Sequence, residues 1–221
     1  MINVAIDGPA GAGKSTIARK AAAELGFIYV DTGALYRTVA LNALRDGVND
    51  TKNPEEVIPT LSSAEVSLKV IDGEQHVFLR DEDVSTAIRQ NEVSMAASNV
   101  SSIPEVRAFL FDLQRNIAKS NDCIMDGRDI GTVVLPDAKI KIFLTASAEA
   151  RADRRFKELQ EKGQDVAYDT ILKEIKERDY QDMNRETAPL KQAEDAVLVD
   201  TTEIGLEESI ALMINTIKER L

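Results

Sequence analysis

The chain has 221 residues, of which 43% are hydrophobic and 29% are charged, a composition that is ordinary for a globular protein and excludes a wholly disordered chain. The single cysteine, Cys123, excludes a disulfide framework and a zinc site built from cysteines, and the single histidine, His76, argues against a Ser-His-Asp triad. The net charge of −11 argues against broad binding to nucleic acids or to a membrane surface. We expect Cys123 to be an inert core thiol and His76 a surface residue.

The location expected from the sequence is the cytoplasm. No apolar run approaches the roughly 18–20 residues of a membrane span. The N-terminus, Met1-Ile2-Asn3-Val4, lacks the basic region of a secretory signal. We expect a cytoplasmic protein that acts as a monomer.

The first 45 residues predict a βαβ unit followed by a further helix. A β-branched run at 2–6 predicts a buried parallel strand, and apolar residues at helical spacing predict a helix over 14–25. A second buried strand is expected at 27–30, and a helix at 34–45. A right-handed crossover is expected to join the two strands.

A change of hydrophobic period then predicts an inserted subdomain at 60–102. Residues 46–60 carry Gly, Asn, Asp and two prolines and are expected to form a loop. Alternating apolar residues at 66–70 and 77–79 predict an antiparallel hairpin that turns at Asp72-Gly73. Polar helical segments at 82–100 are expected to complete a small α+β insertion.

The rest of the chain predicts three more buried strands and several helices. The strands are expected at 123–125, 140–144 and 196–199. The charged stretch 147–195 is expected to form solvated helices joined by a turn at Gly163. Two amphipathic helices are expected to bury Val106, Phe109, Leu110, Leu113 and Ile117 after Pro104, and Ile210, Met213, Ile214 and Ile217 near the C-terminus.

A glycine-rich segment at residues 8–16, here called the phosphate loop, predicts a nucleoside triphosphate site. It matches G-x-x-x-x-G-K-[ST], and it lies between a predicted strand and a predicted helix, which is the context that supports this motif. Glycines let backbone N–H groups converge on phosphate oxygens, and the helix N-terminus adds partial positive charge. The predicted ATP-binding residues of the loop are Gly8, Pro9, Ala10, Gly11, Ala12, Gly13, Lys14, Ser15 and Thr16.

Two side chains of this loop have specific expected roles. Lys14 is expected to reach the β- and γ-phosphates, and the hydroxyl of Ser15 is expected to ligate a Mg²⁺ ion that is held mostly by ATP. Asp126, at the end of a predicted strand, either supplies a carboxylate associated with that ion or only caps the strand. The guanine-reading N-K-x-D element of GTPases is absent from the sequence.

The chain contains 14 arginines despite its acidity, and several follow predicted strands or lie in the charged helices. Ligands of α/β folds bind at the carboxyl ends of the strands, and guanidinium groups suit phosphate. Arg128, in Asp126-Gly127-Arg128-Asp129, is favoured as functional. Arg151, Arg154 and Arg155 are equally well explained as ligand-binding residues or as surface partners of nearby acids.

Four segments of the sequence resemble the bacterial cytidylate (CMP) kinase family. They are the phosphate loop, Asp31-Thr32-Gly33-Ala34-Leu35-Tyr36-Arg37, Asp126-Gly127-Arg128-Asp129-Ile130-Gly131-Thr132, and the stretch 175–190 with Arg178, Asp182 and Arg185. The resemblance implies the P-loop nucleoside monophosphate kinase fold: an α/β fold with a five-stranded parallel sheet of order 2-3-1-4-5, a nucleotide-binding insertion and a helical lid at 148–190. It implies a single kinase domain over 1–221 that transfers phosphate from MgATP to CMP and dCMP in pyrimidine metabolism.

The resemblance also implies roles for particular residues. Arg37, Arg107 and Arg178 would hold the CMP phosphate or its surroundings, and Ser98, Arg128 and Asp129 would read cytosine. Asp182 and Arg185 would hold the sugar, with Arg185 bridging toward phosphate, and Arg154 and Arg155 would belong to the lid beside ATP. Thr32 and Tyr36 would line the CMP side, although Tyr36 could equally serve only to pack its helix. Lys14, Arg128, Arg178 and Arg185 would be the catalytic residues.

The chemistry of the two substrates agrees with these assignments. An aspartate can accept a hydrogen bond from N4 of cytosine while an arginine donates to O2 or N3, a pairing that uracil cannot match. The attacking phosphate oxygen is already anionic, so no general base is needed. Two alternatives are a P-loop kinase for another small molecule and a nucleotide-dependent switch without an acceptor. The missing guanine motif and the surplus of arginines argue against the switch.

Overall fold

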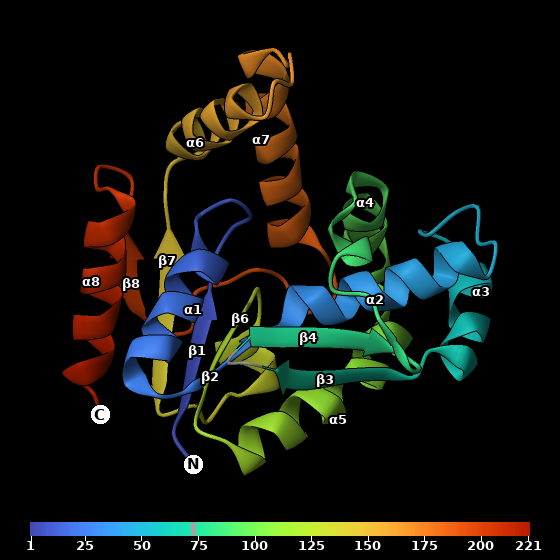
Figure 1. The fold of residues 1–221 in the computed structure, drawn as a ribbon, viewed down its shortest axis with the longest axis horizontal. Coiled ribbons are helices and arrows are strands. Elements are labelled where there is room, and N and C mark those ends of the chain that lie inside the picture. Colours follow the sequence, from blue (N-terminus) through green and yellow to red (C-terminus); the bar gives the residue numbers. More distant parts are fainter. Residues whose placement is uncertain (72–73) are drawn as a thin grey trace. The chain divides into compact units, whose positions relative to one another are not determined.

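The computed structural model describes residues 1–71 and 74–221, which Figure 1 draws as a ribbon. The chain divides into two compact units. The first unit comprises residues 28–123 together with Met1, and the second comprises residues 2–27 and 124–221.

The main sheet has five strands in the order β2-β6-β1-β7-β8. They are β1 (Asn3–Asp7), β2 (Ile28–Asp31), β6 (Cys123–Gly127), β7 (Ile140–Thr145) and β8 (Val197–Asp200). Numbered along the chain as core strands, this is the predicted order 2-3-1-4-5. Val4 pairs with Ile140 and Ile142 pairs with Val197, both in parallel register. Parallel strands are buried on both faces, which explains why these segments read as nearly continuous apolar runs.

In the second unit, helices α1 (Lys14–Leu25) and α8 (Leu206–Lys218) pack side by side (Figure 1). The predicted bounds of α1 are confirmed, and it ends at Gly26, which takes the left-handed conformation. The apolar stripe predicted for α8 is only partly correct. Met213 and Ile217 are fully buried, but Ile210 and Ile214 are half-buried, because the small polar residues Ser209 and Thr216 occupy the rest of the packed face.

The charged segment of the second unit forms two packed helices, α6 (Ala148–Glu161) and α7 (Tyr168–Asn184), as predicted. Gly163 lies in the turn between them with a φ of +70°. Ala152, Leu159 and Ile171 form a small apolar cluster between the helices, and the ring of Phe156 meets that of Tyr168 edge to face. The pair therefore has its own apolar contacts.

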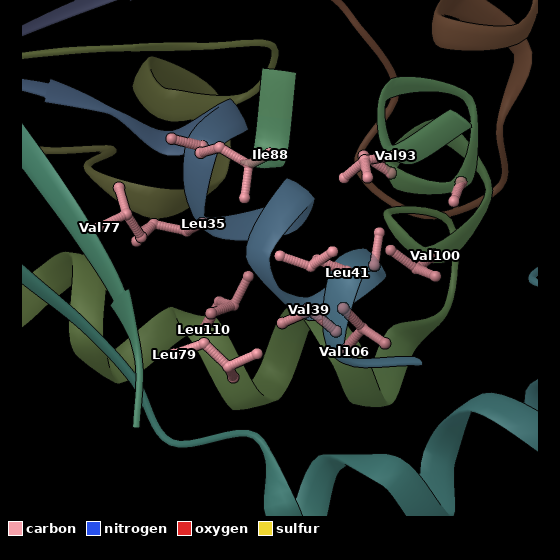
Figure 2. Close-up of a cluster of buried hydrophobic side chains, with 14 of the residues drawn as sticks. Leu35, Val39, Leu41, Val77, Leu79, Ile88, Val93, Val100, Val106 and Leu110 are labelled. Carbon is pink, nitrogen blue, oxygen red and sulfur yellow. The ribbon is translucent and has the colours of Figure 1, made fainter. Parts of the chain in front are cut away.

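The first unit contains α2 (Thr32–Arg45), α4 (Asn91–Val100) and α5 (Pro104–Ser120), packed with a three-stranded antiparallel sheet of order β3-β4-β5. Figure 2 shows the core of this unit, in which Leu35 and Val39 of α2 and Leu110 of α5 are drawn with the strand residues Val77 and Leu79. Figure 2 also labels Leu41, Ile88, Val93, Val100 and Val106.

The predicted hairpin is confirmed as β3 (Val66–Ile71) and β4 (Glu74–Leu79), with Leu68 opposite Val77. The turn predicted at Asp72-Gly73 lies outside the described residues. The segment expected to be helical over 82–100 begins instead with a short third strand, β5 (Glu82–Asp83), and a 3-10 turn, Ala87–Arg89, before α4. Residues 82–83 are exposed and acidic, so the sequence has no apolar alternation that would predict this strand.

Two further predictions for the first unit are wrong in part. The expected loop at 46–60 contains the short helix α3 (Pro54–Val57) and runs into a 3-10 helix, Ile58–Ser63. Asn53 caps α3 by accepting the N–H of Glu55, and Pro54 takes the first helical position, where its missing N–H does no harm. In α5, Phe109 is 38% exposed because the packed stripe follows Val106 and Leu110 on an adjacent line of the helix.

The single cysteine is in the core and the single histidine is near the surface, as the sequence predicted. Cys123 is fully buried at the start of β6, and burial raises the pKa of its thiol to about 12. His76 lies on β4, partly exposed, and its Nδ1 is 2.6 Å from a carboxylate oxygen of Asp83. Within the described ranges, no helix is both long enough and apolar enough to cross a membrane.

Candidate active site

The phosphate loop connects the end of β1 to the start of α1 in the second unit. Gly13 precedes the helix with a φ of +87°, and no side chain caps the first turn. The N–H groups of that turn are therefore available to an anion. Gly8 is required for packing, because a Cβ there would lie 1.9 Å from the carbonyl oxygen of Leu144 on β7. The loop thus has the backbone form that phosphate binding needs.

Two positively charged side chains donate hydrogen bonds to carbonyl oxygens of this loop. Lys14 Nζ donates to the carbonyl of Pro9 at 2.8 Å, and Arg151 Nη1 donates to the carbonyl of Ala10 at 2.9 Å. Carbonyl oxygens that pointed at a phosphate would repel it. With these oxygens bonded to cations, the loop is suited to present N–H groups to an anion.

Lys14 is 5% exposed and lies among charged side chains. Burial and, next, the charge of Arg128 lower its pKa to about 7, although the carboxylates of Asp126, Asp182 and Asp7 act in the opposite direction. An arriving phosphate would bring further negative charge to the buried amine and would favour its protonated form. A bound phosphate would therefore stabilise the charged form of Lys14, the residue that the motif assigns to the β- and γ-phosphates.

Ser15 and Asp126 are brought together at the start of α1. The Ser15 hydroxyl donates to a carboxylate oxygen of Asp126 at 2.9 Å, although the two residues are far apart in the sequence. Hydroxyl and carboxylate oxygens are ligands that Mg²⁺ prefers, and this pairing fits the Walker-B-like alternative for Asp126 rather than a simple strand cap. Across the described chain, no cluster of three or more His, Cys, Asp or Glu side chains is arranged to hold a metal.

Sequence reasoning missed Asp7, the last residue of β1. Its carboxylate is buried and accepts the backbone N–H groups of Ile130 and Gly131, each at 2.7 Å. Burial raises the pKa of Asp7 to about 6, helped by the charge of Asp129, while the two N–H groups and Lys14 lower it. Asp7 thereby fixes the π-helical turn Ile130–Val134 that directly follows the Asp126-Gly127-Arg128-Asp129 segment.

Four residues that the resemblance assigns to cytosine and ribose form two ion pairs in the second unit. Arg128 Nε donates to Asp182 at 2.8 Å, and Arg185 Nη2 lies 3.4 Å from Asp129. All four side chains are largely buried. Arg185 also donates from Nε to the carbonyl of Ala188 at 2.7 Å. These carboxylates and guanidinium groups together offer both acceptors and donors.

Arg151 is the most constrained arginine of the helix pair α6 and α7. Its side chain is 4% exposed and forms a two-pronged ion pair with Asp179 of α7, in addition to its bonds to the carbonyls of Ala146 and Ala10. This geometry gives Arg151 a structural role at the base of α6. Neither alternative offered by the sequence describes it, because Arg151 is buried and its acidic partner lies on another helix, 28 residues away.

The two arginines predicted for the lid face different surroundings. Arg154 donates to the backbone carbonyl of Thr201, just after β8. Arg155 is exposed and pairs with Glu158 at 2.9 Å, one helical turn away, which is the surface pairing weighed as its alternative. Arg178 lies half-buried on α7.

The remaining predicted CMP residues belong to the first unit. Thr32 is buried at the start of α2, and Arg37 on the same helix pairs with Asp31 at 2.9 Å. The guanidinium of Arg107 lies over the ring of Tyr36, 5.7 Å from its centre, so the aromatic ring contacts a cation as well as its own helix. Ser98 lies on α4, and its carbonyl accepts the hydroxyl of Ser101.

Comparison with known proteins gives a consistent family. The cytidylate kinase family model matches residues 4–219. A cytidylate kinase of Caldicellulosiruptor bescii is 55% identical over 207 residues, covering 94% of this chain and 91% of that protein. A cytidylate kinase of Caldanaerobacter subterraneus subsp. tengcongensis is 50% identical over 218 residues, covering 99% of this chain and 95% of that protein.

A structural comparison supports the fold alone. A crystal structure of an uncharacterized protein from Eubacterium ventriosum aligns over the whole of both chains with a TM-score of 0.57 and 14% identity. The family is shown by the sequence matches, which extend over nearly the full chain at 50% identity or more. The chain belongs to the cytidylate kinase family.

Proposed function

We propose that the protein transfers the γ-phosphoryl group of ATP to CMP and dCMP, giving ADP and CDP or dCDP. The observation that supports this best is the pairing of two side chains that follow β6 with two at the end of α7, in which Arg128 contacts Asp182 and Arg185 contacts Asp129. In this set the carboxylate of Asp129 can accept from the exocyclic amine of cytosine, a group that a sugar or a small acid does not offer.

The donor nucleotide is assigned to the phosphate loop. The N–H groups at the start of α1 and the amine of Lys14 would hold its phosphates. The oxygens of Ser15 and Asp126 would hold Mg²⁺ together with those phosphates, and the ion would supply positive charge to the transferring group. Arg154 and Arg155, on α6, are assigned to the ATP side of a lid formed by residues 148–190.

The base of the acceptor is assigned to Asp129 and Arg128, with Ser98 as a further contact. A carboxylate oxygen of Asp129 would accept from N4 of cytosine, and Arg128 would donate to O2 or N3. Uracil carries a carbonyl at position 4, which would face the carboxylate and leave it unmatched in a buried site. Asp182 and Arg185 are assigned to the ribose.

The acceptor phosphate is assigned to Arg37, Arg107 and Arg178, with Thr32 and Tyr36 nearby. A nonbridging oxygen of this phosphate forms the new bond to the γ-phosphorus, and the bond from that phosphorus to the oxygen it shares with the β-phosphate breaks, so that ADP leaves. The attacking oxygen is already anionic, so no side chain has to remove a proton. Lys14, Arg128, Arg178 and Arg185 would stabilise the spread negative charge, and their contribution is alignment and charge.

The remaining assignments follow from this activity. We infer that residues 60–102 serve as the nucleotide-binding insertion of a single kinase domain, and that closure of residues 148–190 excludes water, which limits hydrolysis of ATP. We also infer a cytoplasmic monomer whose partners are the small-molecule substrates, with no nucleic acid or membrane partner.

The proposed activity is tested by measuring ADP release with CMP, dCMP, UMP and AMP as acceptors. We expect CMP and dCMP to be used far better than UMP and AMP. Equal rates with CMP and AMP would contradict the cytosine assignment, and ATP turnover that no monophosphate changes would favour a nucleotide switch.

The base assignment is tested with Asp129→Ala. Loss of one buried, charge-matched contact should reduce the preference for CMP over UMP by about 10- to 100-fold, with little change in the KM for ATP. Asp195→Ala removes an exposed acid that pairs with Lys141 and is the matched control, expected to keep the wild-type preference. An unchanged CMP-to-UMP ratio in Asp129→Ala would refute the assignment.

A further inference from the structure

Gln75 of β4 bonds the hairpin of the first unit to the end of β2. The Oε1 atom of Gln75 accepts the backbone N–H of Asp31 at 2.7 Å. The Nε2 atom of the same side chain donates to the backbone carbonyl of Asp31 at 3.4 Å. Gln75 therefore contacts both backbone polar groups of Asp31.

Asp31 in turn holds the first turns of α2. One oxygen of its carboxylate accepts the backbone N–H of Ala34 at 3.0 Å, which caps the helix. The other oxygen accepts from the guanidinium of Arg37 at 2.9 Å. The position of Arg37, one of the arginines assigned to the acceptor phosphate, is thus tied through Asp31 to Gln75.

The surroundings leave this arrangement little freedom. A Cβ at Gly33 would lie 3.0 Å from a carboxylate oxygen of Asp31 and in ordinary contact with Nη1 of Arg37 at 3.6 Å, so one methyl group would press on the carboxylate that pairs with Arg37. The Nε atom of Arg37 is buried and has no hydrogen-bond partner among the residues that the structure describes. A buried N–H of this kind needs an acceptor, and an oxygen of a bound phosphate is one that a guanidinium binds well.

We propose that Gln75 and Asp31 are positioning residues for Arg37, so that the β3–β4 hairpin sets the geometry with which the acceptor phosphate is held. Gln75 fixes the backbone of Asp31, the carboxylate of Asp31 orients the guanidinium, and Arg37 contacts the phosphate of a nucleoside monophosphate. The inference rests on the proposed function and extends it to a part of the fold that carries none of the predicted substrate contacts.

The first test is steady-state kinetics of Gln75→Ala. Removing the hydrogen bonds at Asp31 should raise the KM for CMP about fivefold, which corresponds to about 1 kcal/mol, and should change kcat and the KM for ATP less than about twofold. Gln75→Asn keeps the amide but is one methylene shorter, and it should behave like Gln75→Ala. His76→Ala alters the neighbouring residue, which contacts Asp83, and should behave like the wild type.

The second test is a double-mutant cycle with Arg37→Ala. If Gln75 acts through Arg37, Gln75→Ala should lower kcat/KM for CMP about fivefold in the wild-type background and less than about twofold in the Arg37→Ala background. Circular dichroism melting of each variant separates a folding defect from a kinetic one, and Gln75→Asn provides the measurement if Gln75→Ala does not fold.

Three outcomes would overturn the inference. They are an unchanged KM for CMP in Gln75→Ala, an equal fivefold loss in both backgrounds of the cycle, and an equal rise in the KM values of both substrates. Failure of the proposed function would look different, because the wild-type protein itself would then show no CMP-dependent release of ADP.

Discussion

Replacing Asp7 with asparagine is expected to remove a pH dependence from the stability of this protein. The carboxyl of Asp7 has an ordinary pKa of 3.8, which burial raises to about 6 in the folded chain. Between these two pH values the folded state holds a proton that the unfolded state has released. The free energy of unfolding therefore falls as the pH rises through this window.

The expected size of the effect follows from the two pKa values. A difference of one pH unit corresponds to about 1.4 kcal/mol, so the full change between pH 3.8 and about pH 6 amounts to about 3 kcal/mol. About 2 kcal/mol of this change lies above pH 4.5, where denaturation is easier to measure. Asparagine does not titrate, so the variant should lack this contribution.

The assay is urea denaturation followed by circular dichroism at pH values from 4.5 to 8. The free energy of unfolding of the wild type, minus that of Asp7→Asn, should decrease by about 2 kcal/mol as the pH rises from 4.5 to 6.5 and should then stay constant. Asp195→Asn is the matched control: the hydrogen bond from Lys141 lowers the pKa of Asp195 below 3.8, so this carboxyl is deprotonated in both states above pH 4.5 and the difference between the wild type and this variant should stay constant over the assay range. Parallel curves for the wild type and Asp7→Asn would refute the reasoning.

Three further predictions concern the phosphate loop and the core. Gly8→Ala should lower the stability by several kcal/mol, because its Cβ would overlap the carbonyl of Leu144, and a melting temperature equal to that of the wild type would contradict the close approach. Binding of MgATP should be accompanied by uptake of nearly one proton at pH 8 and almost none at pH 6, because the pKa of Lys14 is about 7 before binding. Calorimetry in buffers of different ionisation enthalpy measures this uptake. Lys14→Arg stays charged and should show no proton uptake at either pH. Cys123, whose pKa is about 12, should resist alkylation at pH 8 in the folded protein and react in urea, whereas rapid labelling of the native thiol would contradict its burial.

The parts of the fold that could be predicted from the sequence are those with a local signal. The helix Lys14–Leu25 has apolar residues at helical spacing and a glycine stop, and the hairpin register follows from alternation. The helix Pro54–Val57 also had local signals, a capping asparagine before a proline and two acids, but the prolines and glycine nearby suggested a loop. The strand Glu82–Asp83 had none, because it consists of two exposed acidic residues and carries no apolar alternation.

The candidate functional residues divide in the same way. Lys14 and Ser15 could be proposed as ligands of phosphate and Mg²⁺ because the chemistry of their loop is encoded in consecutive residues. Asp7 could not, since its partners are the N–H groups of Ile130 and Gly131, which lie more than 100 residues further along the chain and offer no side-chain signature. Gln75 is similar, because it recognises only the backbone of Asp31.

The attachment of Arg151 to the carbonyl of Ala10 and to Asp179 has a consequence for how substrates arrive and leave. Because the bonds of Arg151 hold the phosphate loop, the loop should keep its shape when no nucleotide is bound. The entropic cost of ordering the loop is then met once, when the chain folds, and not at every turnover. Capture of the next triphosphate should then be governed by encounter and charge, as in lock-and-key recognition, with no slow remodelling of the loop.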